Sequence, residues 1–380
     1  MSLTEKVKSY TEQLNQQGLL RVRQLYEPAN SALIHFDSND YLSLTHDKRL
    51  AKAYQDGYAL YPVGSGASML LSGYHPNHHA VEHAFANLLS VDECILFSSG
   101  YAANLALTAL LGKLKIHSLI DKSIHASVYD GLALSRVSYS RYRHNDLNNL
   151  ALKLKAVPFN SVVYTEGVFS MSGRIAPLSK ISDLCFKNKT ELLVDEAHSF
   201  GVFGNQGKGA VDYHGLTQKE VPLRIIPFGK AFASQGALIA GKKEWIDALL
   251  QTGRSLVYST AISPALSYGL LKTLDIVASS DDRRQKLAEL IKLFREHIKR
   301  SPLQWSNSET PIQQLQLECP HLALHYAKEL KKEGFSCSAI RTPTVNIKST
   351  GLRVILNYRH QPEQIQQLFK KLHDIDEHTH

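Results

Sequence analysis

The chain has 380 residues, of which 43% are hydrophobic and 21% charged, a composition typical of a globular protein with two domains or one large core carrying an appended lobe. The formal net charge is +8, but lysines and arginines are scattered along the sequence, which argues against a nucleic-acid-binding protein. No apolar run approaches the roughly 20 residues of a membrane-spanning helix, so we expect no membrane partner.

The N-terminal segment is polar and charged. It contains no apolar h-region, so no signal peptide is indicated. Val7, Tyr10 and Leu14 recur at helical spacing, which predicts an amphipathic helix over residues 1 to about 20.

Between residues 90 and 240, short apolar runs alternate with helical stretches. Strands are predicted at 93–97, 117–121, 161–165, 191–195, 224–228 and 236–240, with a turn at 98–100 and a helix at 102–111 after the first of them. Continuous apolar strands between helices indicate a largely parallel sheet covered on both faces. In such sheets, functional loops follow the carboxyl ends of the strands.

After about residue 265 the pattern changes. Helices are predicted at 281–299, 322–334 and 362–373, and short strands at 336–340 and 352–356. This mixture predicts a separate α+β lobe. We expect an N-terminal helical and extended segment at 1–45, a large domain at 46–275 and a small C-terminal domain at 276–380.

The four cysteines are far apart in the sequence and form no CxxC pair: Cys94, Cys185, Cys319 and Cys337. Such spacing favours reduced thiols over a disulfide framework or a zinc site. We therefore expect a cytoplasmic protein without a metal.

Two apolar strands each deliver a charged residue to their carboxyl ends. Asp195 ends the run 192–194, and Lys230 follows the run 225–228 after a glycine. A partly desolvated lysine amine is a nucleophile for carbonyl groups, and a nearby aspartate keeps a pyridine nitrogen protonated. Either residue alone is commonly structural. Their combination, 35 residues apart in matching strand contexts, favours a site for an aromatic aldehyde with a ring nitrogen.

Two further segments lie at strand ends. The turn 99–104 (SGYAAN) opens a helix whose free N–H groups suit a phosphate, although an ordinary capped helix has the same pattern. His125 follows another strand, where a histidine is usually a satisfied structural group but is also able to stack on a flat ring.

The chain resembles the α-oxoamine synthases, a family of fold-type I pyridoxal-phosphate enzymes, from about residue 15 to 360. The motifs that carry the resemblance occur in the family's order: 36–42 (FDSNDYL), 64–68 (GSGAS), 72–74 (SGY), 99–104 (SGYAAN), 165–171 (TEGVFSM), 195–198 (DEAH), 228–230 (FGK), 258–260 (YST) and 339–345 (AIRTPTV). The resemblance implies an α/β fold with a large, mostly parallel seven-stranded sheet, helices on both faces and a smaller α+β C-terminal domain.

The resemblance also implies roles in binding pyridoxal 5'-phosphate. Lys230 would bind the cofactor's aldehyde and later move protons at the substrate's α-carbon. Asp195 would pair with the ring nitrogen, and His125 would stack on the ring. The other implied cofactor contacts are Gly100 and Tyr101 at the phosphate, and His198, Ser170 and Glu166 around the phenolic oxygen.

Other implied residues concern the substrates and a second subunit. Arg353 would hold the amino-acid carboxylate and Arg21 the acyl substrate, while Asn39, Tyr41 and His78 match positions lining the site. Thr260 would reach the phosphate of the neighbouring subunit, which implies a homodimer with shared active sites.

The segment 339–345 is most similar to the aminooxononanoate branch of the family. That branch condenses L-alanine with a pimeloyl thioester, on acyl carrier protein or coenzyme A, in biotin synthesis. The products are 8-amino-7-oxononanoate, carbon dioxide and the free thiol carrier. Two alternatives remain: a sister synthase such as glycine C-acetyltransferase or 5-aminolevulinate synthase, and a non-catalytic homologue. A Rossmann nucleotide-binding protein is excluded, because no GxGxxG follows the first strand of a βαβ unit.

Several positions depart from the family pattern. Pro227 stands where a phosphate-contacting threonine is usual, and proline has no N–H donor. Ala67 and Met69 lie in the glycine-rich stretch 64–73, and Ala231 replaces a frequent glycine. The segment 346–351 replaces a Pro-x-Gly-Thr pattern. These changes concern the cofactor edge and the substrate entrance more than the fold.

Overall fold

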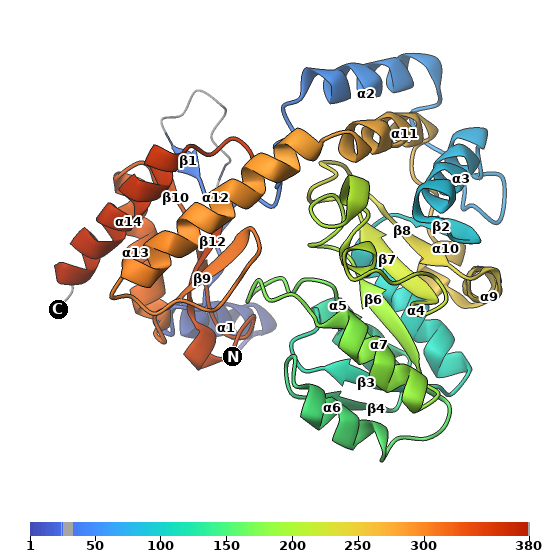
Figure 1. Cartoon of the computed structure of the whole chain (residues 1–380), viewed down its shortest axis with the longest axis horizontal. Helices are drawn as coiled ribbons and strands as arrows, with labels where there is room; N and C mark the ends of the chain where they lie inside the picture. The colour runs from blue at the N-terminus through green and yellow to red at the C-terminus, as the bar shows by residue number, and fades with distance from the viewer. Residues whose placement is uncertain (24, 26–32, 379–380) are drawn as a thin grey trace. The chain divides into compact units, whose positions relative to one another are not determined.

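A seven-stranded sheet, in the order β2-β8-β7-β6-β5-β3-β4, organises the larger of two units in this computed structural model (Figure 1). The structure describes residues 1–23, 25 and 33–378. The larger unit comprises residues 40–170 and 175–285, and the smaller unit comprises 1–39, 171–174 and 286–380. The predicted division into segments 1–45, 46–275 and 276–380 stays a prediction.

The strands of the large sheet are β2 (Glu93–Phe97), β3 (His117–Asp121), β4 (Tyr139–Tyr142), β5 (Ser161–Glu166), β6 (Glu191–Asp195), β7 (Leu223–Pro227) and β8 (Ala237–Gly241). Strands β7, β6, β5, β3 and β4 are mutually parallel, while β8 is antiparallel to both of its neighbours. β7 and β8 therefore form a hairpin, and the Phe228 N–H donates to the Gly236 carbonyl at 2.9 Å across its base.

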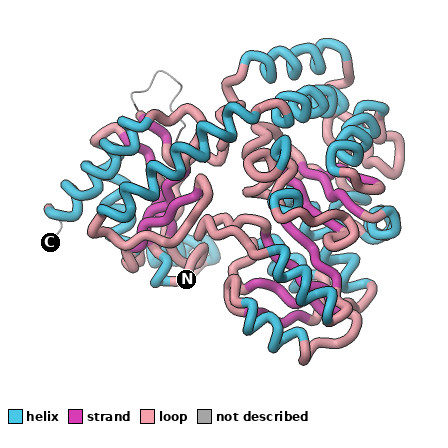
Figure 2. The backbone as a smooth tube through the Cα atoms, viewed as in Figure 1, coloured by secondary structure: helices cyan, strands magenta, loops and turns pink. Residues whose placement is uncertain are grey.

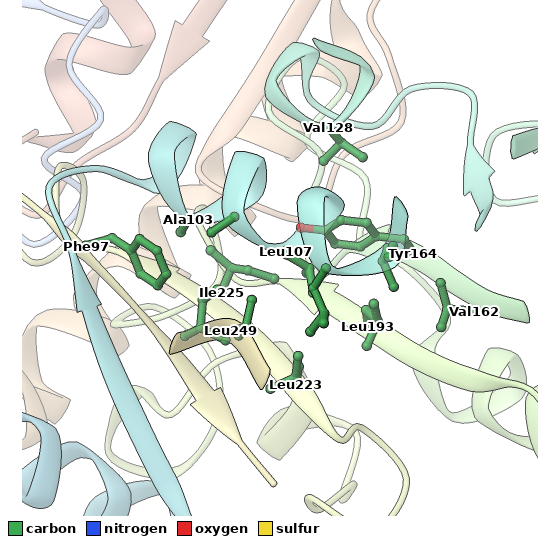
Figure 3. Close-up of a cluster of buried hydrophobic side chains, with 14 of the residues drawn as sticks. Phe97, Ala103, Leu107, Val128, Val162, Tyr164, Leu193, Leu223, Ile225 and Leu249 are labelled. Atoms are coloured by element: carbon green, nitrogen blue, oxygen red, sulfur yellow. The ribbon is translucent and has the colours of Figure 1, made fainter. Parts of the chain in front are cut away.

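The two faces of this sheet are covered by different helices, because alternate strand residues point to opposite sides. One face packs under α4, α5, α9 and α10; Figure 3 shows Leu107, Val128 and Leu249 from three of these helices over the strands. The other face packs against α6, α7 and α8 through side chains such as Ile181 and Val211. Both faces are therefore apolar, which explains the continuous apolar strands in the sequence.

The helices of the larger unit are α2 (Lys48–Leu60), α3 (Pro76–Leu89), α4 (Gly100–Lys113), α5 (Ala126–Leu134), α6 (Leu147–Leu154), α7 (Leu178–Lys187), α8 (Ala210–Tyr213), α9 (Lys243–Thr252), α10 (Arg254–Val257) and α11 (Pro264–Ala278). Helix α11 packs against both α2 and α3. A short 3-10 turn, η1 (Asn205–Gly207), precedes α8.

The smaller unit is an α+β structure, visible in Figure 2 as short strands among long helices. Its elements are α1 (Leu3–Gln16), β1 (Ile34–His35), α12 (Asp281–Arg300, from residue 286), β9 (Ile312–Gln316), α13 (Pro320–Lys332), β10 (Phe335–Ser336), β11 (Ser338–Ile340), η2 (Ile347–Ser349), β12 (Gly351–Ile355) and α14 (Pro362–Glu377). Strands β11, β12 and β9 form an antiparallel sheet, and β1 pairs with β10 in parallel.

These elements confirm the predicted fold class, with strand ends shifted by one residue in several places. Strands β4 and β9 were not predicted, because their polar residues break the apolar pattern of a strand. Helix α1 is confirmed, but Val7 and Tyr10 on its apolar face are 59% and 62% exposed. Cys94, Cys185 and Cys337 are buried, and Cys319 is partly exposed. Among the described residues, no helix is both long and apolar enough to cross a membrane.

Candidate active site

A cavity of about 430 Å³ lies at the carboxyl ends of β2, β5, β6 and β7 in the larger unit. The residues that line it come from loops following those strands and from the starts of α4 and α5: Ser98, Ser99, Gly100, Tyr101, Asn104, His125, Ser127, Glu166, Asp195, Ala197, His198, Pro227, Gly229, Lys230, Ser234, Gln235 and Gly236. Parallel strands end at one edge of a sheet, so segments far apart in the sequence meet there.

Asp195 is the last residue of β6 and is 3% exposed. The amide of Asn104 donates to its Oδ2 at 3.0 Å, and the main-chain N–H of Ala197 donates to its Oδ1 at 2.9 Å. Each carboxylate oxygen therefore has a donor of its own. A buried carboxylate requires such partners, because burial of an uncompensated charge is costly.

Asn104 connects Asp195 to two other cavity residues. Its amide nitrogen also donates to Ser127 Oγ at 2.9 Å, and Ser127 Oγ lies 2.8 Å from His125 Nδ1. The hydroxyl of Tyr164 donates to the side-chain amide oxygen of Asn104, Oδ1. No role was predicted for Asn104, Ser127 or Tyr164 from the sequence. An asparagine inside the otherwise apolar helix 102–111 was the signal available for Asn104.

Glu166 ends β5 beside Asp195 and is 2% exposed. Its Oε2 accepts from the Ser170 N–H at 3.2 Å, while Oε1 has no hydrogen-bond partner within the described part of the chain. Burial, and secondly the negative charge of Asp195, raise the pKa of Glu166 well above its usual value. Burial and the neighbouring charge therefore favour the protonated form of this carboxyl group more than in an exposed glutamate.

Lys230 follows the hairpin strand β7 and lines the cavity. The positive charge of Lys230 also acts on His125. Burial is the main reason why the pKa of His125 is lowered; the charge of Asp195 opposes this shift, and the charge of Lys230 adds to it. His198 is 5% exposed, and its Nδ1 lies 2.7 Å from the hydroxyl of the fully buried Tyr41. The amine, the carboxylate and the imidazoles therefore share one cavity.

The N-terminus of α4 also opens into this cavity. Ser99 caps the helix by accepting from the Ala102 N–H at 3.1 Å, which leaves the preceding N–H groups of the first turn without an intrahelical partner. A Cβ on Gly100 would lie 2.6 Å from Pro227 Cγ, so only glycine fits between the helix and the β7 end. This helix terminus suits a phosphate group.

The remaining candidate residues of the larger unit lie outside the lining of this cavity. Ser170 is linked to it through Glu166. His78 is fully buried in α3, where its Nε2 lies 2.7 Å from the Ile262 carbonyl and its Nδ1 accepts from the His75 N–H at 2.9 Å. Thr260 is exposed in the loop before α11.

The smaller unit holds the other candidates. Arg353 on β12 is 7% exposed, and its Nη2 donates to Asn39 Oδ1 at 2.9 Å. Arg21 Nη2 donates to Thr344 Oγ1 at 3.2 Å. Burial, and secondly the charge of Arg21, lower the pKa of Arg341, so two guanidinium groups lie within electrostatic reach of each other. Thr344 and Arg341 were quoted as part of a motif but were not assigned roles.

The family model for class I and II aminotransferases matches residues 31–372. The chain belongs to this family. Among its curated relatives, an 8-amino-7-oxononanoate synthase of Pseudomonas putida strain GB-1 is 41% identical over 341 residues, covering 90% of this chain and 87% of the relative. Another 8-amino-7-oxononanoate synthase, from Photobacterium profundum, is 36% identical over 382 residues, covering 97% of this chain and 96% of the relative.

Solved structures agree with this membership. The 8-amino-7-oxononanoate synthase of Francisella tularensis is 31% identical with a TM-score of 0.81, covering 91% of this chain and 98% of that one. A serine palmitoyltransferase of S. paucimobilis is 23% identical with a TM-score of 0.91, covering 99% of this chain and 98% of that chain. This similarity supports the fold. The predicted fold type, the acyltransferase class and the dependence on pyridoxal phosphate are thereby confirmed.

Proposed function

We propose that the protein condenses L-alanine with a pimeloyl thioester, releasing carbon dioxide and the thiol carrier and forming 8-amino-7-oxononanoate for biotin synthesis. The observation that carries this proposal is the joint presence of Lys230 and Asp195 in one cavity, at the ends of adjacent strands β7 and β6. Curated relatives with this activity in their names, similar over nine-tenths or more of the chain, support the same reaction.

The cavity residues fit pyridoxal phosphate. An amine, a buried carboxylate, an imidazole and a helix N-terminus surround about 430 Å³, and the Glu166 Oε1 lacks a partner within the described residues. When bound, the cofactor supplies an aromatic ring that accepts electrons from the α-carbon of an attached amino acid.

The protein's own residues would then bind the cofactor and transfer protons. Lys230 binds the cofactor's aldehyde and afterwards takes the proton from the amino acid's α-carbon and returns one after decarboxylation. Asp195 would hold the protonated ring nitrogen through a hydrogen bond, and His125 would stack on the ring and exclude water. The N–H groups of Gly100 and Tyr101 bind the phosphate.

Glu166, His198 and Ser170 are the residues that we assign to the surroundings of the cofactor's phenolic oxygen. The raised pKa of Glu166 favours its protonated form, which would donate a hydrogen bond to that oxygen. His198 is oriented by Tyr41. Ser170 holds Glu166 through its main-chain N–H.

In the smaller unit, Arg353 binds the carboxylate of alanine, and Asn39 fixes the orientation of its guanidinium group. Arg21 with Thr344, reinforced by Arg341, binds the acyl substrate, whose terminal carboxylate matches two guanidinium groups. His78 acts by supporting the α3 terminus. Thr260 contacts the cofactor phosphate of a second subunit in a homodimer. A cytoplasmic location, and the choice between acyl carrier protein and coenzyme A, stay predictions.

A substrate panel tests the reaction. The purified protein with pyridoxal phosphate is incubated with alanine or glycine and with acetyl, succinyl, palmitoyl or pimeloyl thioesters, and both thiol and carbon dioxide are measured. We expect release with alanine and pimeloyl thioester, and none with the Lys230→Ala variant. Preference for glycine or another acyl group would assign the chain to a sister synthase, and no release with any pair would identify a non-catalytic homologue.

A further inference from the structure

Asn104 is a polar side chain on an apolar helix. It is 2% exposed on α4. Ala103 and Leu107 of the same helix belong to the core shown in Figure 3. A buried amide is costly unless its hydrogen bonds are satisfied, and Asn104 makes three, to Asp195, Ser127 and Tyr164. Satisfied networks of this kind fix side-chain geometry.

Tyr164 determines which way the Asn104 amide faces. It is fully buried on β5, and its hydroxyl contacts Oδ1 of Asn104. Burial, followed by the negative charge of Asp195, raises the pKa of Tyr164 well above its usual value, so the hydroxyl stays a donor. A donor at Oδ1 requires the amide nitrogen to face the other way, where Asp195 and Ser127 lie.

The hydrogen bonds then run in one direction towards the cavity. Asn104 uses its two N–H groups on Asp195 Oδ2 and Ser127 Oγ, and Ser127 is left to donate to His125 Nδ1. His125 therefore accepts at Nδ1, which places the proton of the neutral ring on Nε2. One amide thus fixes the rotation of a carboxylate and, together with the Ser127 N–H that donates to His125 Nδ1 at 3.3 Å, favours one tautomer of an imidazole.

We propose that Asn104 is a positioning residue that orients Asp195 and His125 together against the cofactor ring, with Tyr164 fixing its amide. This inference rests on the roles proposed above for Asp195 and His125. Ala197 supplies the second donor to Asp195 from the main chain, so Asn104 is the side chain whose removal frees the carboxylate to rotate.

Cofactor binding to the apoprotein provides the first test. Asn104→Leu keeps a similar volume and removes the donors, and Tyr164→Phe removes only the hydroxyl. We expect the dissociation constant for pyridoxal phosphate to rise about tenfold in Asn104→Leu, the value of one hydrogen bond to a charged group, and less in Tyr164→Phe. The pH midpoint of the bound cofactor's visible absorbance band should also shift in both.

Thr108→Val is the matched control. Thr108 is buried on α4 one turn after Asn104, and its hydroxyl donates to the main-chain carbonyls of Asn104 and Leu105. This variant disturbs the same helix without touching the amide. We expect its dissociation constant and pH midpoint to match the wild type, and an equal shift in all three variants would overturn the inference.

A double-mutant cycle with Asp195→Asn separates this inference from the proposed function. If Asn104 acts through Asp195, Asn104→Leu should change affinity less than twofold in the Asp195→Asn background. Fully additive effects would overturn the positioning role alone. If Asp195→Asn itself leaves affinity and absorbance unchanged, the proposed role of Asp195 is wrong and the inference falls with it. Should Asn104→Leu fail to fold, Tyr164→Phe completes the same cycle.

Discussion

Glu166 and Asp195 are paired residues at the ends of two neighbouring parallel strands, β5 and β6. Both side chains are buried, and both line the same cavity. Two negative charges in this position would repel each other, and the raised pKa of Glu166 favours the protonated form of that residue.

The pH dependence of stability should reveal this proton. Because the folded-state pKa of Glu166 is raised, its contribution is full below the unfolded-state pKa and is lost as pH rises towards the folded-state pKa. The Glu166→Gln variant has no carboxyl group to ionise, so it does not lose stability in this way as the pH rises. In urea unfolding of the apoprotein between about pH 5 and 8, we expect the variant to become increasingly more stable than the wild type as pH rises. The exposed Glu363→Gln is the control, and a pH-independent difference for Glu166→Gln would contradict the assignment.

Replacing Lys230 should abolish the visible absorbance band that the protein forms with pyridoxal phosphate. Turnover should fall by at least about 10²- to 10⁴-fold, the usual contribution of a group that transfers protons in the transition state. Absorbance titration and thiol release measure the two effects in Lys230→Ala. Lys243→Ala, which removes an exposed lysine paired with Glu93, should behave as the wild type. A retained band in Lys230→Ala would exclude Lys230 as the cofactor's attachment point.

Gly100→Ala should weaken both folding and cofactor binding. The added Cβ would approach Pro227 Cγ to 2.6 Å, so α4 or the end of β7 must move. Overpacking of this kind costs about 1–3 kcal/mol, measured by urea unfolding, and displaces the N–H groups assigned to the phosphate. Pro227→Ala in the same chain should restore part of the loss, because it removes the atom that the Cβ meets first. Gly64→Ala, with open space around its Cβ, is the control.

Arg353→Lys should raise the KM for alanine while the affinity for pyridoxal phosphate stays constant. A lysine keeps the charge but loses the planar fork that binds a carboxylate through two parallel hydrogen bonds. A loss of one such bond corresponds to about a tenfold rise in KM. Asn39→Ala should give a smaller rise, since it removes only the partner that orients the guanidinium. A rise in KM for the thioester alone would instead place Arg353 at the acyl group.

The sequence predicted the large sheet well, because strands buried on both faces are continuous apolar runs. Asp195 and Lys230 could be found for the same reason, since each interrupts such a run at its end. Tyr164 and Ser127 could not. In the sequence, Tyr164 resembles any other core residue of an apolar strand. The hydrogen-bond partner of its hydroxyl, Asn104, is brought beside it only when α4 packs on the sheet. Likewise, the proton on Glu166 depends on the strand register that sets Asp195 opposite it.

The antiparallel strand β8 has a mechanical consequence. Because β7 and β8 are joined as a hairpin, the segment carrying Lys230 returns at once into the sheet instead of crossing over through a helix. It is tied at Phe228, whose N–H donates to Gly236 and whose carbonyl accepts from Ser234, each at 2.9 Å. The backbone that leads to Lys230 is thus held at two points, so we expect conformational change during turnover to involve other segments more than this one.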